Sequence, residues 1–113
     1  MTTQAIVPGE LRSFIKDYAD DYYALRLIFF FAAYPNTRFS SRAMFGALGL
    51  TGNYQSLGRA LTKLVENRVL DVSSGNAIPL YRLGDDSGTR SSVIELRKLD
   101  SGQKSELLSL TRV

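Results

Sequence analysis

Carboxylates are the main candidates for catalytic chemistry in this sequence, because it has no histidine and no cysteine. That composition excludes imidazole bases, thiolate nucleophiles, disulfides and nearly every zinc, haem or iron–sulfur site. Asp20-Asp21 falls in a helical pattern where neighbours point about 100° apart, and Asp85-Asp86 falls in a polar stretch, 84–88, expected to be a loop. Neither pair forms a catalytic dyad, and no glycine-rich nucleotide fingerprint occurs. We therefore expect no catalysis, no cofactor and no metal.

Positive charge is concentrated in the middle of the chain. Residues 37–83 have a net charge of +4, whereas the whole chain has a net charge of +3. A local excess of this kind indicates a polyanionic partner more strongly than the global charge does. Four to six basic side chains make a modest footprint, so an ordinary solvated helix face is the competing interpretation.

The chain is expected to form one domain with a single core. It has 113 residues, of which 44% are hydrophobic, a composition typical of a globular protein. Residues 1–8 are expected to be a mobile tail and 9–113 the domain. The longest apolar run, residues 27–34, is far shorter than the roughly 20 residues that cross a bilayer. We therefore expect a cytoplasmic protein without a membrane partner.

Apolar residues at helical spacing predict a long first helix over about 10–34, which Pro35 ends. In the second half of this segment the apolar surface wraps almost completely around the helix, which predicts a homodimer interface. The alternative is that later parts of the same chain cover it. The residues assigned to the interface are Tyr22, Tyr23, Leu27, Phe30 and Phe31.

Two shorter helices should follow. Residues 37–39 look extended, Ser40 or Ser41 can cap a helix through 42–48, and Gly49 can end it. After a short turn, Asn53 can cap a third helix over about 54–67.

A hairpin and a C-terminal extension complete the expected order. The runs 69–74 and 77–83 alternate in hydropathy around Gly75-Asn76, which predicts a β-hairpin. Residues 84–113 form the extension, in which 92–113 is expected to be mostly helical and interrupted near Ser101-Gly102. A strand that extends the hairpin is the alternative for this segment.

This order resembles the winged helix-turn-helix family over residues 37–83. The residues that carry the resemblance are Leu48-Gly49-Leu50, Asn53, Leu57, Leu61, Leu64 and Val69-Leu70. The turn before Asn53 is about two residues longer than the commonest form, and Arg68 stands where many members have glycine, so Asn67 is expected to take the left-handed conformation. The resemblance implies a mainly α fold with a small β-hairpin (α+β), here with a long N-terminal helix and a C-terminal extension.

The resemblance also implies contacts with double-stranded DNA, in which the third helix enters the major groove and the hairpin touches the backbone. Gln55 would then pair with adenine, Arg59 with guanine and Lys63 with phosphate. The full set implied is Arg38, Arg42, Asn53, Tyr54, Gln55, Ser56, Arg59, Thr62, Lys63, Ser74, Asn76 and Arg82.

The expected function is that of a transcriptional regulator of bacterial or archaeal type that binds DNA as a homodimer. Two recognition helices on a two-fold axis would read two half-sites, which multiplies the contacts of one helix. The alternative is a protein-interaction or assembly module that does not bind DNA, because fold alone does not determine function. The sequence specifies neither an operator nor an effector ligand.

Overall fold

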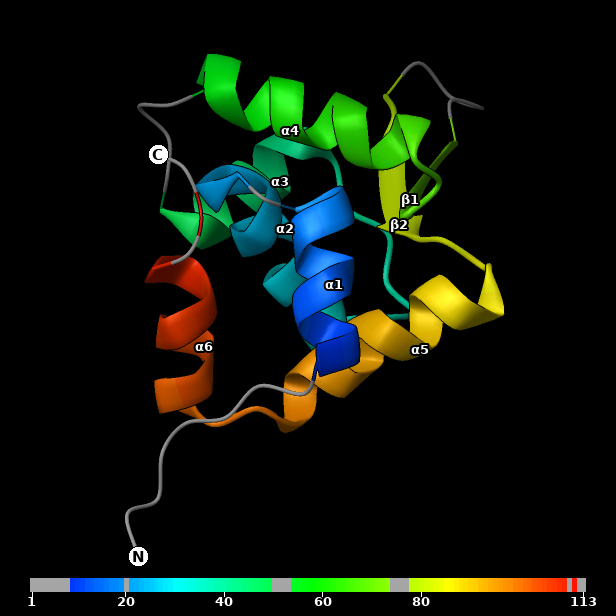
Figure 1. Ribbon diagram of the computed structural model, residues 1–113. Helices are drawn as coiled ribbons and strands as arrows, with labels where there is room; N and C mark the ends of the chain where they lie inside the picture. Colours follow the sequence, from blue (N-terminus) through cyan, green and yellow to red (C-terminus); the bar gives the residue numbers. More distant parts are fainter. Residues whose placement is uncertain (1–8, 20, 50–53, 74–77, 110, 112–113) are drawn as a thin grey trace, which may run out of the picture.

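The structure is a computed structural model that describes residues 9–19, 21–49, 54–73, 78–109 and 111. The predicted tail, residues 1–8, and the predicted Gly75-Asn76 turn lie outside these residues. The elements shown in Figure 1 are α1 (Gly9–Tyr18), α2 (Tyr22–Ala33), α3 (Ser41–Leu48), α4 (Tyr54–Glu66), β1 (Leu70–Ser73), β2 (Leu80–Leu83), α5 (Ser87–Glu95), the 3-10 helix η1 (Leu96–Lys98) and α6 (Ser101–Ser109). In the described part of the chain no helix is long and apolar enough to cross a membrane.

The prediction of one continuous helix over 10–34 is wrong, because the segment forms two helices, α1 and α2. Asp21 is the N-cap of α2: its side chain accepts hydrogen bonds from the backbone N–H groups of Tyr23 and Ala24, at 2.9 and 3.1 Å. Asp21 itself is extended, with φ −97° and ψ 140°, so the helical ladder restarts there. The apolar spacing continues across the break because both helices bury one face, and spacing alone cannot reveal it.

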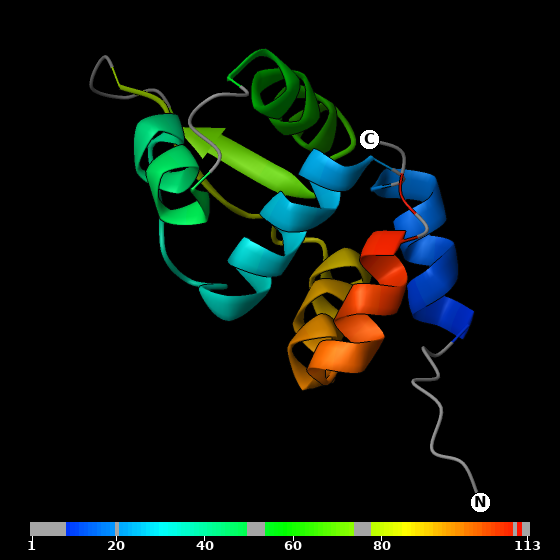
Figure 2. The same ribbon diagram turned by 90° about the vertical axis from the view of Figure 1, so that its left-hand side faces the viewer.

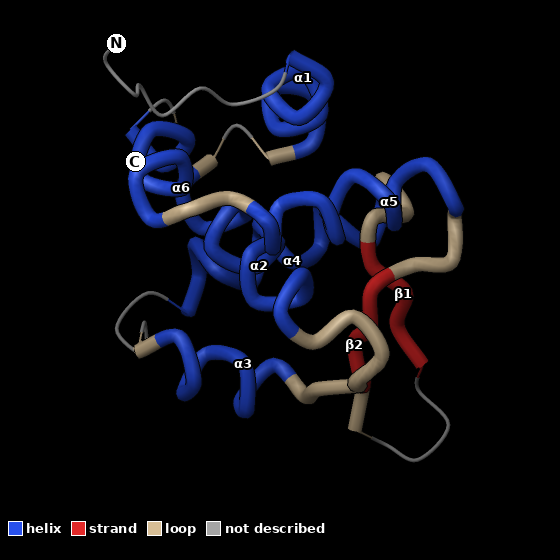
Figure 3. Tube along the Cα trace, turned by 90° about the horizontal axis from the view of Figure 1, so that it is seen from below, coloured by secondary structure: helices blue, strands red, loops and turns tan. Residues whose placement is uncertain are grey.

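Helix α2 lies at the centre of the molecule. Figures 2 and 3 show α3, α4 and the hairpin on one side of it, and α1, α5 and α6 on the other. The side chains of Leu25, Leu27, Ile28 and Phe31 are fully buried within the single chain. The predicted dimer interface is therefore wrong at Leu27 and Phe31, because elements of the same chain cover them.

The three other residues assigned to that interface are aromatic and less deeply buried. Tyr22, Tyr23 and Phe30 are partly buried, so each keeps some surface open to solvent. Phe30 also contacts the ring of Phe39 edge-on, with 4.7 Å between centroids. Most apolar side chains of α2 therefore pack against other parts of the same chain.

The two helices of the predicted helix-turn-helix are confirmed. Ser40 caps α3 by accepting a hydrogen bond from the backbone N–H of Ala43 at 3.2 Å, and Gly49 ends this helix with φ 68°. Helix α4 turns its predicted leucines into the core, and its buried residues are Leu57, Ala60, Leu61 and Leu64. The predicted capping residue Asn53 lies outside the described residues.

The predicted hairpin is confirmed as an antiparallel pair in which Leu70 faces Leu83 and Ser73 faces Leu80. The extended piece before α3 joins its free side, because Phe39 and Tyr81 exchange backbone hydrogen bonds of 2.9 and 2.7 Å. This second, short pairing is consistent with a winged-helix-like layout.

At the base of the hairpin, Arg68 rather than Asn67 takes the left-handed conformation, with φ 61°. Many winged-helix proteins have glycine at the position of Arg68. The backbone there has the left-handed conformation that glycine favours, although the residue is an arginine. Gly84 closes the base: its N–H donates to the carbonyl of Val69 at 2.9 Å, and an added Cβ would lie 2.7 Å from the Arg68 carbonyl oxygen.

The C-terminal extension is helical, as favoured, but its helices begin and end elsewhere. Helix α5 starts at Ser87, inside the stretch expected to be a loop, because Asp86 caps it by accepting from the Thr89 N–H at 3.0 Å. The interruption falls at residues 99–100, where Asp100 and Gln103 cap α6 reciprocally at 2.9 and 2.8 Å. The expected fold class, mainly helical with one small hairpin, is confirmed.

Candidate nucleic-acid interface

Six of the twelve predicted DNA-binding residues lie on the outer face of α4. Figure 1 shows α4 running across one side of the molecule with the hairpin beside its end. The buried residues of α4 hold its inner face in the core, and they are Leu57, Ala60, Leu61 and Leu64. The opposite face of the helix points outward. The exposed residues of the predicted set on this face are Tyr54, Gln55, Arg59, Thr62 and Lys63, and Ser56 is half-buried.

Two contacts position the N-terminal half of this face. The ring of Tyr54 lies 5.7 Å from the ring of Phe45 on α3, although 58% of Tyr54 is exposed. One turn along, the Arg59 guanidinium donates to the Ser56 hydroxyl at 3.5 Å. Gly58 lies between them, and an added Cβ there would meet nothing within 4 Å, so the surface is open at this point. A partner can approach the helix backbone closely here.

Sequence reasoning missed two acidic residues next to this face. Glu66 borders the same shallow hollow as Tyr54 and Lys63, at the C-terminal end of α4. Asp21 lines a second hollow, between the start of α2 and α4, together with Arg59 and Lys63. Glu66 could have been found from the sequence, because it lies four residues after Thr62 and so on the same face of the helix. Asp21 was hidden by the assumption that the first helix is continuous.

Arg38 lies at the edge of the hairpin, and Arg42 lies at the start of α3. Arg38 is exposed and donates to the Ser73 hydroxyl at 3.5 Å, and it shares a groove with Val72 and Leu80 on the hairpin. Arg42 is exposed in the first turn of α3, where free backbone N–H groups also favour anions. Both are open to a phosphate backbone.

Arg82 is differently placed, because it already has two carboxylate partners. Its guanidinium makes a two-bond contact with Asp85, at 3.1 and 2.8 Å, and lies 3.7 Å from Asp71. The hydrogen bond and charge of Arg82 hold the pKa of Asp85 below its usual range, and the hydrogen bond to Asp85 raises the pKa of Arg82. Arg82 therefore brings no excess positive charge to the outer side of the hairpin.

The predicted set is thus divided by the structure into three groups. Residues on α4 form one continuous face, Arg38 and Arg42 flank the hairpin and α3, and Arg82 is neutralised. Asn53, Ser74 and Asn76 lie outside the described residues. In the part of the chain that the structure describes, no three acidic side chains gather closely enough to hold a metal ion.

The exposed side chains on this face of α4 are rich in hydrogen-bond donors. An amide, a guanidinium, a hydroxyl and an ammonium follow each other along one helix, and each is a group that can donate hydrogen bonds to nucleic-acid bases or phosphates. Comparisons of the chain with protein-family models, curated proteins and solved structures give no match.

Proposed function

We propose that this chain is a cytoplasmic transcriptional regulator that binds double-stranded DNA with the outer face of α4 in the major groove. The observation that supports this most is the continuous exposed face formed by Gln55, Arg59, Thr62 and Lys63 on a helix whose other face is core. The bridge between Phe39 and Tyr81 adds to it, because it gives the hairpin the position of a wing.

Each part of the surface has a distinct role in this proposal. Gln55 and Arg59 lie in the first half of α4 and read base edges, since a planar amide matches adenine and a planar guanidinium matches guanine. Lys63, one turn further, contacts phosphate as a point charge. Arg38, at the edge of the hairpin, and Arg42, in the first turn of α3, contact phosphates.

Fluorescence anisotropy against a random-sequence duplex at two salt concentrations tests the proposal. We expect a dissociation constant of about 10⁻⁴–10⁻⁶ M that weakens steeply as salt rises, because phosphate contacts release counterions. Absence of binding even at low salt would refute it.

Three variants separate base reading from phosphate contact. Arg59→Ala should relax base preference at one position of a selected site, at a cost of about 1–3 kcal/mol. Lys63→Ala should weaken binding to all sequences and lower the salt slope by about one. Lys98→Ala removes the same charge from η1 and is the control, because η1 lies on the other side of α2. Equal effects of the first two variants on every sequence would contradict the role of Arg59.

Homodimerisation is part of the same proposal, but the interface is smaller than the one expected from the sequence. Leu27 and Phe31 are not available to a partner, so Tyr22, Tyr23 and Phe30 are the residues of the predicted interface that keep exposed area. Size-exclusion chromatography with light scattering measures the mass directly. A strict monomer at high concentration would remove the dimer from the proposal and leave DNA binding to one α4.

One observation favours a second candidate function, a protein-interaction module. Three apolar side chains on the hairpin stay exposed: Val72 at 44%, Ile78 at 64% and Leu80 at 37%. Apolar side chains gathered on one element are typical of protein contacts. This candidate predicts negligible DNA affinity together with loss of partner binding in the variant Ile78→Ser, so the anisotropy titration distinguishes the two functions.

A further inference from the structure

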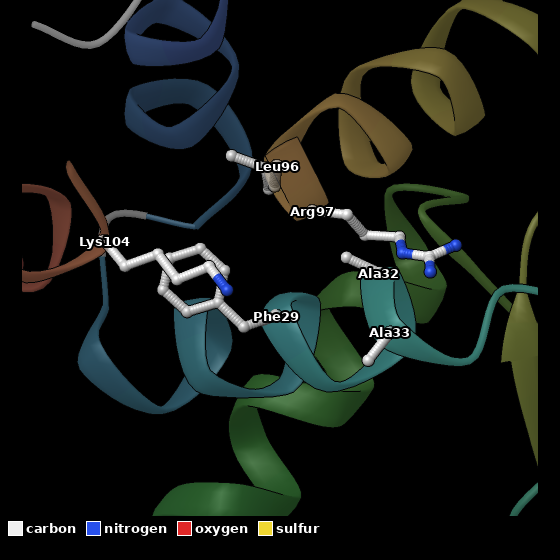
Figure 4. Close-up of a pocket in the computed structure, with 6 residues that line it drawn as sticks. All are labelled: Phe29, Ala32, Ala33, Leu96, Arg97 and Lys104. Atoms are coloured by element: carbon white, nitrogen blue, oxygen red, sulfur yellow. The ribbon is translucent and has the colours of Figure 1, made fainter. Parts of the chain in front are cut away.

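A small cavity lies on the side of α2 that faces away from α4. Its volume is about 140 Å³, and it opens between α2, η1 and α6 (Figure 4). The apolar lining residues form its floor and are Phe29, Ala32, Ala33 and Leu96. Ala32 and Leu96 are buried, so Phe29 and Ala33 provide the accessible apolar surface. Two bases, Arg97 and Lys104, line the same cavity.

The two bases lie at different ends of this cavity. Figure 4 shows the Lys104 side chain lying along the ring of Phe29, and the Lys104 ammonium is 6.0 Å from the ring centroid. Arg97 extends over the end formed by Ala32 and Ala33. A ligand on the apolar floor would therefore have a cation on either side.

The positive charge of these two bases is not neutralised within the described part of the chain. Neighbouring acids already have other partners: Glu106 pairs with Arg12 at 2.6 Å, and Glu95 pairs with Lys98 at 3.0 Å. None of the six lining residues is acidic. Two cations beside an apolar floor are the complement of an anion with an apolar body.

We infer that this cavity binds a small carboxylate with a ring-sized apolar body, the chemistry of an aromatic carboxylic acid. A cavity of about 150 Å³ is large enough for one benzene ring, so the volume of about 140 Å³ is close to that of a single ring. The planar fork of a guanidinium matches a carboxylate, and Lys104 adds a second cation. Nothing in this inference depends on DNA binding, because the cavity and the outer face of α4 lie on opposite sides of α2.

Titration with benzoate, followed by nitrogen–proton correlation spectra in a buffer without phosphate or carboxylate, tests the inference. We expect saturable shifts at the backbone amides of Ala33, Leu96 and Arg97, with a dissociation constant on the order of 1–10 mM for so small a ligand. Acetate, which lacks the ring, and benzyl alcohol, which lacks the charge, should each bind at least about fivefold more weakly than benzoate. Inorganic phosphate should also bind more weakly, because it leaves the apolar floor uncovered.

Point variants assign the site. Arg97→Gln and Lys104→Gln should each weaken benzoate binding about two- to fivefold, the effect of losing one solvent-accessible charge pair. Ala33→Leu should weaken it by about fivefold or more, because the larger side chain occupies the opening. Lys98→Gln is the matched control, since it removes one positive charge from the same η1 but does not line the cavity.

The outcomes separate the inference from its alternatives. Equal weakening by Lys98→Gln and Lys104→Gln would overturn it, because that result reports general charge attraction. Phosphate binding as tight as benzoate binding, or benzoate binding that Ala33→Leu leaves unchanged, would overturn the apolar part and leave an anion site. Circular dichroism of each variant shows that the fold is retained, and none of these measurements involves DNA.

Discussion

Replacing Leu27 by alanine tests whether α2 is the centre of a single-chain core or part of an interface between copies. Leu27 has no exposed side-chain surface, and the side chains around it belong to the same chain. If this arrangement is correct, the variant leaves a cavity inside each molecule. The free energy of unfolding should then fall whether or not the molecules associate.

The expected loss follows from the complete burial of the side chain. A fully buried leucine replaced by alanine costs about 2–5 kcal/mol, because hydrophobic transfer energy is lost and the cavity collapses only partly. A domain of this size has a total unfolding free energy of about 5–15 kcal/mol, so the loss is a large fraction of it. With an m-value of about 1–3 kcal/mol per M of urea, a loss of about 2–5 kcal/mol should lower the unfolding midpoint by roughly 0.7–5 M.

Urea unfolding, followed by circular dichroism at two protein concentrations about tenfold apart, measures both quantities. Ile78→Ala is the control, because Ile78 is 64% exposed and the change should cost less than about 1 kcal/mol. A drop of the same size at both concentrations supports the single-chain core. A loss below about 0.5 kcal/mol, or a midpoint that moves with protein concentration only in the wild type, would refute the burial argument.

Three further predictions concern the base of the hairpin and the start of α5. Gly84→Ala should destabilise the fold by about 1–3 kcal/mol, because its Cβ would lie 2.7 Å from the Arg68 carbonyl oxygen, and a neutral urea midpoint would contradict this clash. Arg68→Gly should raise stability by about 0.5–1 kcal/mol, since φ is 61° there, and a decrease in thermal midpoint would show that the arginine side chain matters more than the backbone. Asp86→Ala should destabilise α5 at neutral pH, because the hydrogen bond from the Thr89 N–H holds the pKa of Asp86 below its usual range. That contribution is complete above the unfolded pKa and is lost as pH falls through the lower folded pKa, so urea midpoints of wild type and variant should converge below about pH 4. A difference that stays constant down to pH 2 would contradict it.

Helix α4 was predictable because its pattern is simple. Leucines at 57, 61 and 64 recur at helical spacing among polar residues, and this spacing determines both the buried face and the outer face. The start of α3 was narrowed to a cap at Ser40 or Ser41, and Gly49 was recognisable as its end, since these residue types match what those positions require. The exposed residues of the candidate site therefore follow from sequence once the helix is assigned.

Other features depend on contacts that the sequence does not display. The break before Asp21 lies within an unbroken apolar spacing, so only the capping bonds to Tyr23 and Ala24 reveal it. Helices α5 and α6 each bury few residues, Val93 and Leu107 among them, so their periodicity is weak. The neutralisation of Arg82 required knowledge of where Asp71 and Asp85 lie in space.

The two faces of α4 are under different physical constraints. Leu57, Leu61 and Leu64 determine whether the chain folds, whereas the exposed Gln55 and Thr62 carry little of the folding free energy. Inherited changes on the outer face can accumulate one at a time without a loss of folded protein. Over many generations, lineages that share this core would come to differ in the chemistry of the outer face of α4 while they keep the same framework.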